Sequence, residues 1–72
     1  MPDPQETARI VARDLGPLVG EIASLKSESR RDLEGRPQYR ALLDRLEATH
    51  AAAEAALVEA RRRVRLDEER HT

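Results

Sequence analysis

The sequence predicts an all-α protein: a two-helix antiparallel hairpin, coiled-coil-like, that dimerises into a four-helix bundle. In both halves of the chain the apolar residues recur at alternating intervals of three and four, which is typical of a helix with one packed face. The break Gly35-Arg36-Pro37 lies between the two halves. A chain of 72 residues without cysteine has too little core to stand comfortably alone, so residues 1–72 form one small domain that needs a partner.

The first helix is predicted over residues 4–34. Asp3 suits the N-cap, Pro4 suits the first helical position, and Glu6 places a carboxylate at the positive end of the helix. Gly35 stands where a helix commonly ends in a left-handed residue. The packed stripe predicted for this helix consists of Val11, Leu15, Leu18, Ile22 and Leu25.

Pro17 interrupts this helix in the sequence. Proline removes a backbone donor and clashes with the preceding turn, which costs roughly 3 kcal/mol in a helix interior. The helix either kinks near Pro17 or ends there, with a new helix starting at the proline. The apolar spacing continues unbroken through Pro17, so the kink is the favoured interpretation.

The second helix is predicted over residues 37–66, after a turn at 35–36. Pro37 is a good first helical residue, and alanines between positions 48 and 56 add helix propensity. Residues 67–72 have no apolar face and put acids at the negative helix end, which predicts a frayed tail. When the chain folds back at the turn, a residue of the first helix is expected to lie level with a residue of the second helix if their numbers sum to about 71–75. The packed stripe is predicted to contain Tyr39, Leu43, Leu46, His50, Ala53, Leu57, Ala60 and Val64.

The composition excludes several classes of function. The formal net charge is −1 with both signs interspersed, which argues against a uniformly basic nucleic-acid surface. Tyr39 is the sole aromatic residue, so base stacking has little to build on. No apolar run is long enough for a membrane span, and no signal-peptide core is present, so we expect a cytoplasmic protein.

One short motif suggests a metal site. The spacing Glu47-x-x-His50 resembles the ligand pair of ferritin-like carboxylate bundles, in which a facing helix supplies another glutamate. The resemblance is confined to these residues. Glu21 is the glutamate of the first helix that we expect at the height of His50. The resemblance implies a miniature metal-binding hairpin. If this protein were an enzyme, the resemblance implies a metal-dependent oxidase. The simpler interpretation is that Glu47 is solvated and that His50 is a polar residue of the packed stripe that sets register.

A second cluster is Arg61-Arg62-Arg63 with Arg65. Consecutive helical residues point in different directions, and acids follow at once, so a solvated helix end is favoured over a phosphate site. A small nucleic-acid- or polymerase-associated regulator is the third alternative. We therefore expect a non-catalytic structural or protein-interaction module without cofactor or small-molecule substrate. Its partner is expected to be a second copy of itself or a larger protein assembly.

Overall fold

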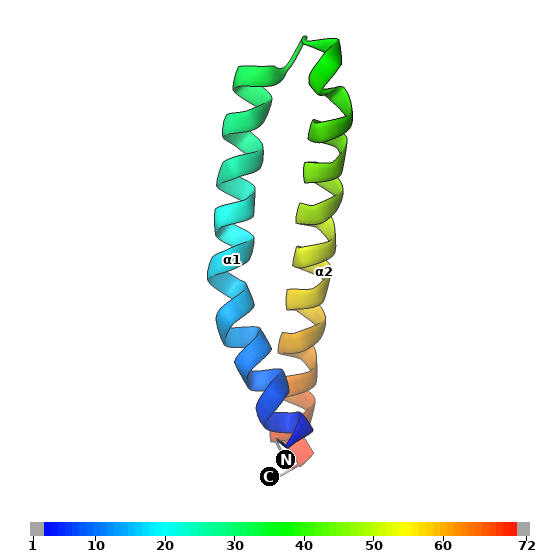
Figure 1. The fold of residues 1–72 in the computed structure, drawn as a ribbon. Coiled ribbons are helices and arrows are strands. Elements are labelled where there is room, and N and C mark those ends of the chain that lie inside the picture. The colour runs from blue at the N-terminus through cyan, green and yellow to red at the C-terminus, as the bar shows by residue number, and fades with distance from the viewer. Residues whose placement is uncertain (1–2, 71–72) are drawn as a thin grey trace.

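The computed structural model describes residues 3–70 and forms an antiparallel helical hairpin (Figure 1). Helix α1 spans Pro4–Leu33, a short 3-10 helix η1 spans Pro37–Tyr39, and helix α2 spans Arg40–Arg70. The two long helices lie side by side along a molecule of 53 × 21 × 14 Å. The all-α hairpin expected from the sequence is thereby confirmed.

The start of α1 is capped as its sequence predicts. Asp3 has an extended backbone, and its carboxylate accepts a hydrogen bond of 3.1 Å from the Gln5 N–H. Its backbone carbonyl accepts the first helical bond, 3.0 Å from the Thr7 N–H. Pro4 follows at the first helical position, and Glu6 adds a negative charge in the first turn. A helix without this cap would leave the N–H groups of its first turn to water.

Helix α1 continues through Pro17 without a break. The alternative in which Pro17 opens a separate helix is therefore wrong. In Figure 1 the N-terminal turns of α1 lean across towards α2, and the change of direction lies in the light-blue turns that contain Pro17. A proline in a helix interior gives such a bend, because the ring pushes away the carbonyl one turn earlier.

A type II turn reverses the chain. Glu34 has φ −62° and ψ 138°, Gly35 has φ +85°, and the Arg36 N–H donates to the Leu33 carbonyl at 3.2 Å. This turn type needs a positive φ at its third residue, which glycine adopts without strain. The left-handed glycine expected at position 35 is present. The connection is longer than the predicted turn at 35–36, because Pro37 begins a 3-10 turn before α2 starts.

The packed face of α2 follows the predicted stripe from Leu43 onward. Leu57 is buried at 7% exposure. The packed face then continues past Val64 to Asp67, which is buried at 6% exposure. Helix α2 ends at Arg70, beyond the predicted end at Leu66. In Figure 1 this end of α2 lies at the same end of the molecule as the start of α1, whose positive helix end favours a carboxylate. Residues 71 and 72 of the predicted tail lie outside the described residues.

Helix α1 turns a different face to α2 from the predicted one. Only Leu15 and Ile22 of the predicted stripe are half-buried, while Val11, Leu18 and Leu25 are exposed. The predicted stripe and the observed face share Leu15 and Ile22, and both follow the same alternation of three and four. The spacing of apolar residues therefore does not decide between them. Beside the exposed Val11 and Leu18, the smaller Ala12 and Val19 face α2, and small residues allow a closer approach of two helices. The half-buried positions that alternate along this face are Ala8, Ala12, Leu15, Val19, Ile22, Lys26, Ser29 and Leu33.

A candidate protein-interaction face

One edge of the hairpin carries charged side chains that link the helices. Arg30 Nη1 lies 3.3 Å from Glu47 Oε1, and both side chains are about half exposed. About four turns further from the hairpin turn, the Arg61 guanidinium passes over Gly16, so that an added Cβ there would lie 3.5 Å from its Nη2. We call this edge the charged flank; its positions at intervals of seven are Gly16, Ala23 and Arg30 on α1 and Glu47, Glu54 and Arg61 on α2.

The opposite edge is apolar. Helical periodicity places on it the positions on the other side of the packed faces, again at intervals of seven. We call this edge the apolar flank; it consists of Val11, Leu18 and Leu25 on α1 and Leu42, Thr49 and Ala56 on α2. The four large residues are 40–55% exposed. The Thr49 hydroxyl donates to the Arg45 carbonyl at 2.8 Å, so this side chain could be covered without stranding a donor.

The hairpin exposes more surface than its mass predicts. Its accessible area is 5785 Å². A compact monomer of this mass, 8.1 kDa, exposes about 4,500 Å². The excess of roughly 1,300 Å² per chain reflects a molecule only two helices wide. Of the described residues, Leu57 alone is a buried hydrophobic residue, so most apolar side chains still contact water.

A polar layer interrupts the packing between the helices. Lys26 Nζ lies 3.1 Å from His50 Nδ1, and His50 Nε2 lies 2.8 Å from Glu54 Oε1. A lysine ammonium can only donate, so Nδ1 must accept and the ring proton sits on Nε2, which donates to Glu54. The His50 side chain is 13% exposed. His50 is therefore a satisfied polar residue between the helices, with one ring nitrogen bonded to Lys26 of α1 and the other to Glu54 of α2.

The residues of the proposed metal site have other partners. Glu47 pairs with Arg30, and His50 is held by Lys26 and Glu54. Glu21 is exposed on α1. Within residues 3–70 no three His, Cys, Asp or Glu side chains converge to hold a metal ion. In this arrangement the Lys26 ammonium lies beside Nδ1 and the Glu54 carboxylate beside Nε2, so both ring nitrogens of His50 have protein partners.

The arginines at 61–63 do not form a common surface. Arg61 crosses to Gly16 on the charged flank, whereas Arg62 Nη1 lies 3.4 Å from Glu59 Oε2 on the outside of α2. Arg63 follows Ala56 by seven residues and so ends the α2 column of the apolar flank. Because the three side chains point in different directions and one of them is paired with Glu59, they do not form a common phosphate-binding surface.

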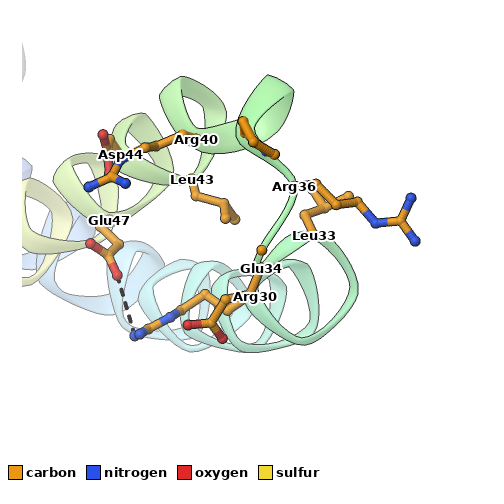
Figure 2. A pocket seen from close by; sticks show the side chains of 10 residues that line it. Arg30, Leu33, Glu34, Arg36, Arg40, Leu43, Asp44 and Glu47 are labelled. Carbon is orange, nitrogen blue, oxygen red and sulfur yellow. Dashed lines mark ion pairs between the residues drawn. The ribbon is translucent and has the colours of Figure 1, made fainter.

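A shallow pocket of about 490 Å³ lies under the hairpin turn (Figure 2). Leu43 points into it, the Arg30–Glu47 ion pair closes one side, and the Arg36 side chain extends away from it. Three arginines and three acids line the pocket, so their formal charges cancel and favour neither an anion nor a cation. The lining residues are Arg30, Leu33, Glu34, Gly35, Arg36, Pro37, Arg40, Leu43, Asp44 and Glu47.

The predicted interface residues divide into three groups. Leu57 is buried, and Tyr39 joins Val11, Leu18 and Leu25 among the exposed residues. The half-buried group consists of Leu15, Ile22, Leu43, Leu46 and Val64. Sequence reasoning missed the contribution of Lys26 to the polar layer. The available signal was that the single lysine of the chain lies four residues after Ile22, at the spacing of the packed face.

Neither helix has, within residues 3–70, a stretch both long and apolar enough to traverse a bilayer. Comparisons with protein-family models, curated proteins and solved structures found no match to this chain.

Proposed function

We propose that this protein is a non-catalytic interaction module that acts by self-association, through the apolar flank, into a four-helix bundle. The observation that carries the proposal is the contrast between the two edges of the hairpin. The charged flank carries the Arg30–Glu47 ion pair and the Arg61 side chain, whereas the apolar flank exposes valine and leucine at regular intervals of seven on α1 and Leu42 on α2. Contiguous exposed apolar residues on a small helical protein are typical of a protein interface.

Energetic considerations support the same proposal. The excess area of roughly 1,300 Å² per chain is comparable with what each partner of a standard to large interface buries. A two-helix hairpin with one buried hydrophobic residue among those described is marginal alone, since small domains seldom gain enough from their core. Covering the apolar flank with a second copy would complete a bundle in which each helix has two neighbours.

The test is the mass of the protein in solution combined with its thermal unfolding. Sedimentation equilibrium should give a dimer. The midpoint temperature by circular dichroism should rise with protein concentration, because dissociation accompanies unfolding. A monomeric mass with a concentration-independent midpoint would refute self-association, and docking onto a larger protein would then become the working hypothesis.

A pair of neighbouring substitutions makes this test specific to the apolar flank. Leu25→Lys places a charge on the apolar flank, where Leu25 is 53% exposed. Ser24→Lys adds the same charge one residue earlier, on the outside of α1, where Ser24 is exposed. Leu25→Lys should shift the protein to monomer at concentrations where wild type and Ser24→Lys remain dimeric. Equal dissociation of both variants would mean that the apolar flank is not the interface.

A further inference from the structure

The orientation of the second copy can be argued from the charges that surround the apolar flank. Two arrangements cover the flank with its own copy by a two-fold axis. In the first, the axis runs along the helices, both turns lie at the same end, and α1 packs against α2 of the second copy. In the second, the axis crosses the helices, the turns lie at opposite ends, and each helix packs against its own copy.

The border of the apolar flank is acidic on α1. Asp14, Glu21 and Glu28 follow the flank residues by three positions, one turn away, and all three are exposed. The α1 column itself ends in Asp32, beyond Leu25. With the turns at opposite ends, these acids would face the same acids of the second copy. Like charges at such short range are destabilising.

The corresponding positions of α2 include two arginines. Arg45 lies on the border, three residues after Leu42, and Arg63 ends the α2 column after Ala56. The other two border positions are Ala52, which is uncharged, and Glu59, which pairs with Arg62. An axis along the helices preserves height, so α1 meets α2 of the second copy at the register seen within one hairpin. There, Arg30 reaches Glu47 and Lys26 reaches His50. The same offset brings Asp32 to Arg45 of the second copy.

The sizes of the side chains agree with the charges. On α1 the apolar flank is formed by Val11, Leu18 and Leu25, whereas on α2 the matching heights carry the smaller Thr49 and Ala56. Packing α1 against α2 of the second copy sets large residues against small ones, which fills the space evenly. Packing each helix against its own copy would crowd one seam and leave the other underfilled.

Resting on the proposed function, we infer that the second copy binds with its turn at the same end, so that α1 of each copy packs against α2 of the other. Asp32 of each copy then pairs with Arg45 of the other. At the open end of the bundle, Asp14 lies near Arg63 of the other copy, although Asp14 already accepts a 2.9 Å bond from Arg13.

Distances between spin labels test this orientation. The chain has no cysteine, so Arg36→Cys gives a single label site in the turn, on a side chain that extends into solvent (Figure 2). With the turns together, the two labels should lie within about 30 Å, given helix separations of 8–10 Å. With the turns at opposite ends they would lie roughly 40 Å or more apart, since about 29 residues rise 1.5 Å each.

Arg65→Cys is the matched label site at the other end of the molecule, where Arg65 is exposed on α2. Labels on Arg65 alone should also give a short distance, and a mixture of the two labelled proteins should add a long one. A long distance for each single variant and a short one for the mixture would overturn the orientation while leaving self-association intact. No dipolar signal in any sample would instead contradict the proposed function.

A charge exchange gives an independent readout. Asp32→Arg and Arg45→Asp should each weaken dimerisation, by roughly threefold to tenfold, because each variant changes two pairs per dimer. The double variant should regain wild-type affinity if the two residues face each other across the interface. If the double variant lost as much dimerisation free energy as the two single variants added together, the pairing of Asp32 with Arg45 would be contradicted.

Discussion

Two layers of the same hairpin interior differ in how they hold the helices together. Around Leu57 the packing is apolar, and this leucine is 7% exposed. Two turns closer to the hairpin turn, His50 sits at the equivalent position of α2, with its ring bonded to Lys26 of α1 and Glu54 of α2. An apolar layer contributes stability in proportion to the area it buries, whatever the register. A polar layer contributes little net stability, but it is satisfied in only one register.

This difference explains how a hairpin of only two helices fixes the alignment of α1 along α2. Alanine at positions 53 and 60 of α2 gives few shape constraints, so sliding by one heptad would cost the apolar layers little. The same slide would separate Lys26 from His50 and leave an ammonium and an imidazole nitrogen without partners. We therefore interpret the polar layer as the determinant of register and the apolar layer as the main source of stability.

The largest expected effect comes from breaking the apolar layer. Leu57→Ala should lower the free energy of unfolding by about 2–5 kcal/mol, because it removes buried methyl groups and leaves a cavity. Val58→Ala is the matched control, since Val58 is 65% exposed on the outside of α2 and should change stability by less than about 0.5 kcal/mol. Urea unfolding followed by circular dichroism measures both. Similar losses for the two variants would show that the packed face of α2 is misassigned.

The polar layer should respond less strongly and in a different way. Lys26→Met keeps the length of the side chain but removes the donor to His50 Nδ1, leaving an imidazole acceptor 13% exposed without its partner. We expect a loss of about 1–3 kcal/mol, the typical cost of one stranded buried group. Nitrogen chemical shifts of the His50 ring should report the proton on Nε2 in the wild type. A proton on Nδ1 would contradict the assigned network.

The double variant Lys26→Met/His50→Leu sharpens the interpretation further. Replacing both partners with apolar groups removes the stranded acceptor, so the double variant should be more stable than Lys26→Met and comparable with the wild type. If the polar layer sets register, the double variant should also lose uniqueness, seen as broadened or doubled amide resonances in NMR spectra. A stable double variant with one sharp set of resonances would mean that register is set elsewhere.

The fold could be predicted from sequence further than the interface could. The cap at Asp3, the continuous helix through Pro17 and the left-handed Gly35 follow from local rules that act within one turn, and each is present. The face that α1 turns to α2 was not predictable in the same way. Two stripes share Leu15 and Ile22, and hydrophobicity favours the larger set that includes Leu18. The choice depends on how closely the helices approach, which is a property of the pair.

The division of that stripe carries information about association. A helix with one packed neighbour needs one apolar stripe, whereas α1 has a second column of large residues, including Leu18 and Leu25, directly beside the first. Two adjacent stripes are typical of a helix with two neighbours. The pattern in α1 therefore predicts two neighbouring helices, α2 and one more.

The smallest expected effect concerns the ion pair on the charged flank. Arg30 and Glu47 link the two helices at 3.3 Å, just as Lys26 and His50 do at 3.1 Å, but their side chains are 52% and 48% exposed. Water screens such a pair, and ordering two long side chains offsets part of the attraction. A double-mutant cycle with Arg30→Ala and Glu47→Ala should therefore give a coupling below about 1 kcal/mol, falling further in 1 M salt. The cycle for Lys26 and His50 should give a larger coupling that salt changes less, because that pair is shielded from solvent. If the Arg30–Glu47 coupling were the larger of the two, register would be set at the exposed edge of the hairpin, and the role given to the polar layer would be wrong.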